Sequence, residues 1–274
     1  MNQNFELKQF GDIKYFRCIP LEETNLVKHV FTTRQGGVSE IPFDSLNLSF
    51  NVGDKVEMVL ENRKRISKVL NLNYQDIISS QQIHKDNILI INKKNRNKLA
   101  IQDNKIIADA DALVTDIPGI PLLMCYADCV PIMVLDPVKK AIALIHSGRR
   151  GTELEITFKT IKKMQDIFIT NPQSCLAAIF PSIAPCCYRF SKHSEISNFW
   201  ITEENLKQQI ILIKDNEVCL DLQKANYLQL LKAGLQKDKI FIHKMCTYDF
   251  SSFFFSHRRD KGKTGRMGAL LMIK

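Results

Sequence analysis

Residues 127–148, ADCVPIMVLDPVKKAIALIHSG, decide the fold of this chain. Two apolar runs flank a polar turn that contains Pro137, and this pattern predicts a β-hairpin. Counting outward from the turn pairs Asp136 with Ala141. The same register sets Cys129 opposite Gly148 and makes His146 its diagonal neighbour on one face. Diagonal neighbours lie about 7–8 Å apart, so the hairpin offers a thiol and an imidazole jointly to a bound ion or substrate.

The segments on both sides of the hairpin alternate between strand and helix patterns. Asp54, with Glu57 as the partner in a capping box, predicts a helix that runs to about Leu70. A second helix is predicted over Gly151–Phe168, and a third begins at Asp221 as its cap. The predicted strands are Ile13–Ile19, Val30–Thr33, Ile88–Ile91, Ala112–Thr115, Ala177–Phe180, Phe241–His243 and Leu270–Ile273. This alternation predicts a single α/β domain, residues 1–274, with one mixed β-sheet flanked by helices.

Composition excludes several classes of protein. The formal net charge of +9 favours anionic ligands. The basic residues are scattered and form no finger or RNA-recognition pattern, so we expect no nucleic-acid partner. No apolar run is long enough for a membrane helix, and no signal peptide is visible. Eight cysteines without a secretory signal indicate thiols in a cytoplasmic protein. The sequence shows no coiled coil, and we expect a monomer.

A third residue joins Cys129 and His146 as a candidate for chemistry. His84 precedes an apolar strand, and together the three residues could form a zinc site with one open position. A second interpretation is a Cys-His nucleophile pair, in which imidazole lowers the thiol pKa. The third, a buried cysteine beside a hydrogen-bonded histidine, is the one that the residues alone favour. The adjacent pair Cys186-Cys187 has no zinc-ribbon spacing.

Basic residues stand in three places where an anion could bind. Arg63 lies on the apolar face of the first predicted helix, so it either snorkels outward, which the sequence favours, or faces an anion in a site. The turn Gly148–Thr152 joins a strand to a helix N-terminus and carries two arginines. Residues 256–268, SHRRDKGKTGRMG, combine five Lys or Arg side chains with three glycines but match no P-loop.

A series of ordered motifs resembles the YfiH/YlmD family, also called the laccase-domain or multicopper polyphenol oxidase family. The resemblance extends from about Thr32 to Ile273. The motifs that carry it are 32–39 (TTRQGGVS), Asn47-Leu48, 61–63 (ENR), 82–84 (QIH), 108–115 (ADADALVT), 127–131 (ADCVP), 146–152 (HSGRRGT), 181–183 (PSI), Cys187-Tyr188, Asp221-Leu222 with Asn226, 258–260 (RRD) and 264–267 (TGRM).

This resemblance implies a fold and an activity. The fold would be the cysteine-histidine hydrolase type shared with the catalytic domain of cytotoxic necrotising factor. The activity would be phosphorolysis of adenosine, inosine and methylthioadenosine, with adenosine deamination as well. The family's zinc ligands fall on His84, Cys129 and His146, which would also be the catalytic residues. Copper is the other metal to consider, but the chain lacks the pattern of a multicopper oxidase.

The implied substrates are purine nucleosides and phosphate. For these we nominate Arg34, Asn47, Arg63, Arg258 and Arg266. Asp111 and Asp128 are weaker candidates to carry a proton. Two alternatives remain: a metal-free Cys-His hydrolase, such as an enzyme that edits peptidoglycan precursors, and a copper polyphenol oxidase. The chain departs from the family pattern at Ser147 and Arg149, where Ala and Trp are usual, and at Lys85, where Gly is usual.

Overall fold

The predicted hairpin forms the centre of a sheet in the computed structural model, which describes residues 3–96, 108–191, 193, 210–214 and 216–274. Strand β8 (Val130–Asp136) pairs antiparallel with β9 (Ala141–Ser147). The register runs from Asp136 opposite Ala141 to Val130 opposite Ser147, which confirms the predicted pairing. Every residue of both strands is buried, as expected for strands covered on both faces.

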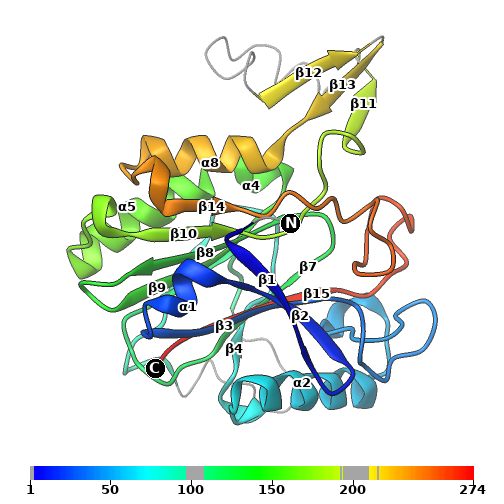
Figure 1. Cartoon of the computed structure of the whole chain (residues 1–274), viewed down its shortest axis with the longest axis horizontal. Helices are drawn as coiled ribbons and strands as arrows, with labels where there is room; N and C mark the ends of the chain where they lie inside the picture. Colours follow the sequence, from blue (N-terminus) through cyan, green and yellow to red (C-terminus); the bar gives the residue numbers. More distant parts are fainter. Residues whose placement is uncertain (1–2, 97–107, 192, 194–209, 215) are drawn as a thin grey trace.

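Two six-stranded mixed sheets make up the body of the molecule (Figure 1). The sheet of the hairpin has the order β14-β10-β8-β9-β6-β5, with parallel pairs at both edges. Its other strands are β14 (Ile240–Ile242), β10 (Leu176–Ile179), β6 (Ala112–Thr115) and β5 (Ile88–Ile90). Each of these four lies within a residue or two of a predicted strand.

The second sheet has the order β1-β2-β3-β15-β7-β4 and is antiparallel except for its β7–β4 edge. Its strands are β1 (Phe5–Phe10), β2 (Ile13–Cys18), β3 (Val27–Thr32), β15 (Met267–Ile273), β7 (Leu122–Tyr126) and β4 (Ile78–Ser79). The prediction of one sheet is therefore wrong. Strand periodicity locates strands, but the sheet that each strand joins depends on contacts between distant segments.

The two sheets pack face to face with helices outside them, which gives four layers (Figure 1). Apolar side chains of both sheets, such as Phe31 and Met124 from one and Met133 and Leu144 from the other, form the central core. Helix α2 (Val56–Leu70) covers the outer face of the β15 sheet through Ile66 and other side chains. Helices α5 (Ile156–Phe168) and α8 (Leu222–Lys232) cover the outer face of the hairpin sheet.

Smaller elements complete the fold. They are α1 (Ile19–Glu23), α4 (Arg149–Glu153), four 3-10 turns (Phe50–Val52, Tyr74–Asp76, Pro172–Ser174 and Lys237–Lys239), and the three-stranded sheet of β11 (Arg189–Ser191), β13 (Glu217–Leu220) and β12 (Ile211–Lys214). In the described part of the chain, no helix combines the length and apolar character that crossing a membrane requires.

One of the predicted helix caps is confirmed, one is wrong, and one predicted helix is divided in two. Asp221 caps α8 by accepting a hydrogen bond from the backbone N–H of Lys224, as predicted. Asp54 does not cap α2, because its carboxylate accepts hydrogen bonds from Ser39 and Asn47 instead. The helix predicted over residues 151–168 is two helices, because Glu155 adopts a left-handed conformation, with φ of 57°, between α4 and α5.

Candidate metal centre and its cavity

His84, Cys129 and His146 come together at the open end of the hairpin. One ligand atom from each, an imidazole nitrogen or the Cys129 sulfur, lies within 4.8 Å of the other two. The two imidazole rings stand perpendicular, with centroids 4.9 Å apart. His146 is buried, Cys129 is half-buried and His84 is exposed. Two imidazoles and a thiolate are a donor set that zinc accepts in three-ligand sites with an open fourth position.

Asp111 fixes the two histidines from behind. Its carboxylate is completely buried, and Oδ1 accepts hydrogen bonds from the His84 backbone N–H at 3.0 Å and from His146 Nδ1 at 2.8 Å. Oδ2 accepts from the backbone N–H groups of Ile83 and Lys85. Because Nδ1 of His146 is held by the carboxylate, Nε2 is the nitrogen left for the centre. A carboxylate behind a ligating histidine is the usual support of a metal site.

The same carboxylate holds His84 in an unusual backbone conformation. His84 has a φ of 57°, in the left-handed region, within the turn that Asp111 clamps. Just before the turn, Gln82 exchanges two hydrogen bonds of 2.8 Å with the backbone of Cys125 in β7. These contacts attach the His84 segment to both large sheets. Burial opposes ionisation of Asp111, but His146 and the backbone N–H groups outweigh it and lower the pKa of the carboxyl.

The environment of Cys129 favours its thiolate. Burial of the sulfur would raise the pKa of Cys129, but the imidazoles of His146 and then His84 outweigh it and lower that pKa to about 6. The thiolate and Asp111 in turn raise the pKa of His146 to about 9, against the effect of burial. The glycine at position 148 leaves room for the Cys129 side chain, because a Cβ there would lie only 2.8 Å from the Cys129 sulfur.

Asp128 ties the C-terminal loop to the hairpin. Its φ is 87°, and its carboxylate accepts hydrogen bonds from the hydroxyls of Thr247 and Ser256 and from the backbone N–H of Arg258. The loop that follows Ser256 thereby reaches the centre, although it lies far away in the sequence. Asp128 and Asp111 both have their oxygens occupied by donors, which suits holding the site together rather than carrying a proton.

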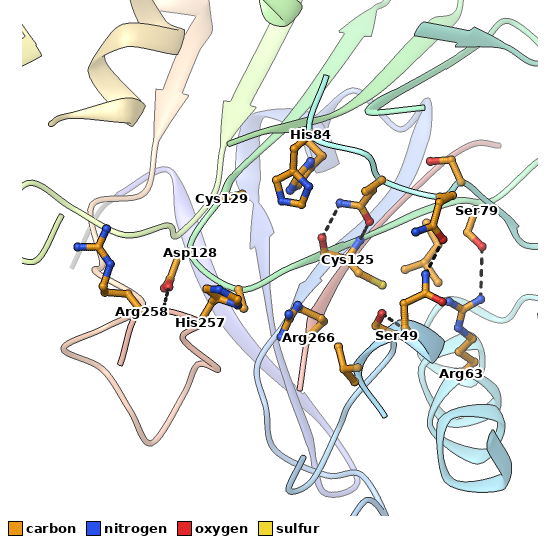
Figure 2. A pocket seen from close by; sticks show the side chains of 18 of the residues that line it. Ser49, Arg63, Ser79, His84, Cys125, Asp128, Cys129, His257, Arg258 and Arg266 are labelled. Carbon is orange, nitrogen blue, oxygen red and sulfur yellow. Dashed lines mark hydrogen bonds between the residues drawn. The ribbon is translucent and has the colours of Figure 1, made fainter. Parts of the chain in front are cut away.

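A cavity of about 380 Å³ opens in front of the three residues (Figure 2). Arg63, Arg258 and Arg266 line it, and Figure 2 shows Arg63 and Arg258 at opposite ends with His84 and Cys129 between them. Its other lining residues are Ser49, Asn51, Val52, Ser79, Ser80, Gln81, Gln82, Leu123, Cys125, Ala127, Asp128, His146, Tyr188 and His257. The interior combines three guanidinium groups with polar side chains and one carboxylate, that of Asp128, so positive charge is in excess and the cavity suits a polar ligand that carries negative charge.

Arg63 does not snorkel outward. It is 1% exposed, its Nε donates to the carbonyl of Leu48 at 2.9 Å, and its guanidinium lies 4.3 Å from the centre of the Phe50 ring. Its Nη1 lies 3.4 Å from the Ser79 hydroxyl. Within the described residues no carboxylate forms an ion pair with Arg63, Arg258 or Arg266. A buried cation without a carboxylate partner indicates a place for an anion.

Two of the nominated residues lie outside this cavity. Arg34 forms an ion pair of 3.1 Å with Asp44 and stacks on Phe255, in a separate surface depression. Asn47 is buried behind the wall, where its Oδ1 accepts the backbone N–H of Arg266 at 3.0 Å. Asn47 therefore positions a lining arginine rather than facing the cavity.

The Gly148–Thr152 turn, predicted as a place for an anion, forms the short helix α4, in which Arg149 pairs with Glu153.

Sequence reasoning missed several residues of the site. Tyr188 and His257 line the cavity, and Arg258 stacks 4.8 Å from the centre of the Tyr188 ring. Both residues reach the cavity from loops; the only sequence signals were the Cys187-Tyr188 family motif for Tyr188 and the basic, glycine-rich segment 256–268 for His257. Burial and the neighbouring Arg266 lower the pKa of His257, so its imidazole is neutral near pH 7.

Comparisons with known proteins match nearly the whole chain. A family model described as multi-copper polyphenol oxidoreductase laccase matches residues 28–274. Purine nucleoside phosphorylase YlmD of Bacillus subtilis (strain 168) is 33% identical over 251 residues, which cover 89% of this chain and 87% of that protein. Its namesake from Geobacillus stearothermophilus is 35% identical over 244 residues, 88% of each chain. The crystal structure of YlmD from Geobacillus stearothermophilus superposes with a TM-score of 0.89, at 32% identity and 98% coverage of both chains.

Proposed function

This chain belongs to the multi-copper polyphenol oxidoreductase laccase family, that of the YfiH and YlmD proteins, and from that premise we propose that it is a zinc-dependent purine nucleoside phosphorylase. The relatives are named purine nucleoside phosphorylases. The observation that carries the proposal is a His-His-Cys cluster in one cavity with three arginines that have no carboxylate partner among the described residues. We extend it to adenosine, inosine and methylthioadenosine as substrates, and to adenosine deamination as a second activity.

The residues present fit a zinc ion. His84, Cys129 and His146 would hold it, since their ligand atoms already converge and Asp111 fixes His146 through Nδ1. A zinc ion held there would supply Lewis-acid polarisation of a substrate oxygen or of water.

Phosphorolysis requires that a phosphate oxygen is held close to C1′ of the ribose. The C1′–N9 bond breaks as the new C1′–O bond forms, and the departing purine takes up a proton. Arg63 and Arg266 carry fixed positive charge inside the cavity, which suits an anion that must be oriented for attack. His257, a neutral imidazole on the cavity wall, can donate a hydrogen bond to the departing base. Tyr188 offers the base an aromatic surface.

A second candidate function is a metal-free cysteine hydrolase, including one that edits peptidoglycan precursors. Cys129, His146 and Asp111 stand in the order nucleophile, base and orienting carboxylate. The pKa of about 6 for Cys129 makes its thiolate available at neutral pH. Copper oxidation of phenols has less support, because the described residues that line the cavity include no methionine for an axial copper ligand.

The deciding experiment measures release of purine base from a panel of nucleosides, with and without phosphate and with and without a zinc chelator. We expect turnover that requires phosphate and is lost after chelation, and we expect Cys129→Ala to abolish it. The matched control is Cys175→Ala, which removes a buried thiol outside the cavity lining. Turnover that continues in Cys129→Ala contradicts the assignment. Turnover that survives complete zinc removal but not Cys129 alkylation favours the metal-free hydrolase.

The phosphate site has its own test. Replacing Arg266 by Gln should raise the KM for phosphate by at least tenfold and change the KM for nucleoside much less. Arg34→Gln is the matched control, because Arg34 is already paired with Asp44 outside the cavity. Equal changes in both KM values for Arg266→Gln, or a larger phosphate effect for Arg34→Gln, would contradict this placement of the phosphate.

A further inference from the structure

A second cluster of metal-ligating side chains lies beside the cavity. Cys186, Cys187, Cys246 and Asp249 each offer one ligand atom, and these four atoms all lie within 4.8 Å of one another. None of the four lines the cavity. Cys246 is 4% exposed, Cys187 is half-buried, and Cys186 and Asp249 are at the surface. The cluster therefore has a buried base and an open side through which an ion could enter.

Two of the contacts in the cluster are close to those of a zinc site. The Cys186 and Cys187 thiols donate hydrogen bonds to the two oxygens of Asp249, at 3.2 and 3.0 Å. In a zinc site with Zn–S of about 2.3 Å and Zn–O of about 2.0–2.2 Å, a sulfur and an oxygen lie roughly 3.5 Å apart. For these two thiol–carboxylate pairs, replacing the shared protons with one ion needs the atoms to separate by only a few tenths of an ångström.

The surroundings of the cluster offer hydrogen-bond donors, although burial and Asp249 raise the pKa of the Cys186 and Cys187 thiols. The backbone N–H of Ala184 points at the Cys246 sulfur at 3.4 Å, a contact that stabilises a metal-bound thiolate. Three thiolates and one carboxylate leave two negative charges in excess over a divalent ion, so nearby cations are needed. Arg189 Nε donates to the carbonyl of Cys186, and Arg259 Nη1 donates to the carbonyls of Thr247 and Tyr248. Both guanidinium groups also pair with a carboxylate, Arg189 with Glu217 and Arg259 with Asp260.

The backbone brings the four side chains together before any ion binds. Ser182 and Cys246 form a parallel bridge, and the backbone N–H of Thr247 donates to the Ser182 carbonyl at 3.0 Å. Adjacent residues point to opposite faces of a strand, but Cys186 and Cys187 lie in a turn closed by hydrogen bonds to the Ala184 carbonyl. Both thiols can therefore face the same point.

We propose that Cys186, Cys187, Cys246 and Asp249 bind a zinc ion that fastens the segment before β11 to the segment after β14. Four protein ligands are the composition of a structural site rather than a catalytic one. Binding releases the protons of the three thiols and leaves their oxidation state unchanged. The ion would stabilise one wall of the cavity, because Tyr188 follows Cys187 and Thr247, which follows Cys246, donates to Asp128 at 2.6 Å.

Zinc stoichiometry tests this site separately from the candidate catalytic centre. Zinc content is measured by inductively coupled plasma mass spectrometry. We expect two zinc ions per chain in the wild-type protein and one in Cys246→Ser. Cys129→Ala should also retain one, and the double variant none. Cys175→Ser is the matched control, because its hydroxyl can keep the hydrogen bond that the Cys175 thiol makes to the Asn171 carbonyl. Wild-type zinc content in Cys246→Ser would overturn the proposal.

Two further measurements keep the test decisive if Cys246→Ser does not fold. Asp249→Asn changes an exposed side chain and should weaken zinc binding at this cluster by at least tenfold in a competition titration. Zinc should also protect Cys186 and Cys187 from alkylation in the native protein. An intact disulfide among the three cysteines after purification without reductant would overturn the proposal, as would unchanged affinity in Asp249→Asn. If the wild-type protein shows no phosphorolysis, that result counts only against the proposed function and not against this zinc site.

Discussion

Asp111→Asn tests how much of the candidate centre depends on one buried carboxylate. The substitution keeps the size of the side chain but turns one acceptor oxygen into an N–H₂ donor. Each Asp111 oxygen accepts two hydrogen bonds, so the amide N–H₂ meets two backbone donors in one orientation and one backbone donor, that of His84, in the other. An unsatisfied buried donor costs about 1–3 kcal/mol, so we expect a lower free energy of unfolding.

The effect on the metal should be larger than on the fold. If the amide nitrogen faces His146, it donates a hydrogen bond to Nδ1. The imidazole then carries its proton on Nε2, the nitrogen that the metal centre needs free. Loss of such a supporting group typically lowers metal affinity 10–100-fold, equivalent to about 1.4–2.7 kcal/mol. We therefore expect the zinc Kd of Asp111→Asn to rise by that factor, measured by competition with a chromophoric chelator at constant pH.

Asp109→Asn is the matched control, since it makes the same chemical change on an exposed side chain two residues away. Its zinc Kd should stay within twofold of the wild type. Thermal unfolding followed by circular dichroism shows whether Asp111→Asn is folded under the conditions of the titration. A folded Asp111→Asn protein with wild-type zinc affinity would refute the reasoning, because it would mean that Asp111 does not set the His146 tautomer.

Three other predictions concern the glycine at the centre, a buried histidine and a helix cap. Gly148→Ala places a Cβ 2.8 Å from the Cys129 sulfur, so zinc affinity should fall at least tenfold while the unfolding temperature changes little; unchanged affinity would contradict the close approach. Burial lowers the pKa of His29 from 6.5 to about 3, so below pH 6.5 the unfolded chain binds a proton that the native state does not, and the free energy of unfolding should drop by about 2 kcal/mol between pH 6.5 and 4.5. Urea titrations should show a smaller drop in His29→Gln, and an equal drop would contradict this assignment. Asp221→Ala removes the hydrogen bond to the Lys224 N–H and should lower the free energy of unfolding by about 1 kcal/mol in the same assay. Asp54→Ala should not lower it through loss of a helix cap, because Asp54 does not cap α2.

Local patterns in the sequence were sufficient for the elements nearest the site. The turn at residues 136–140 and its two apolar arms determined the β8–β9 register, since a slip by one residue would reverse the faces of both strands. That register alone placed Cys129 near His146. The Asp221 cap and the strand Ala112–Thr115 were equally local, because each depends on neighbours within a few residues. The position of His84 before an apolar strand suggested it as the third member of the cluster, and the family motifs supported that choice.

Tertiary structure decided what those patterns could not. The division of the strands between two sheets, the burial of Arg63 and the exclusion of Arg34 from the cavity all depend on contacts between distant segments. Asp111 contacts His146 across 35 residues, and the Cys187 thiol contacts Asp249 across 62. Sequence spacing carries no information on such pairs, because the intervening chain can take many paths and only the packed core selects one. The sequence therefore determined which residues could do chemistry, and the packing of the two sheets and their loops determined which of them meet.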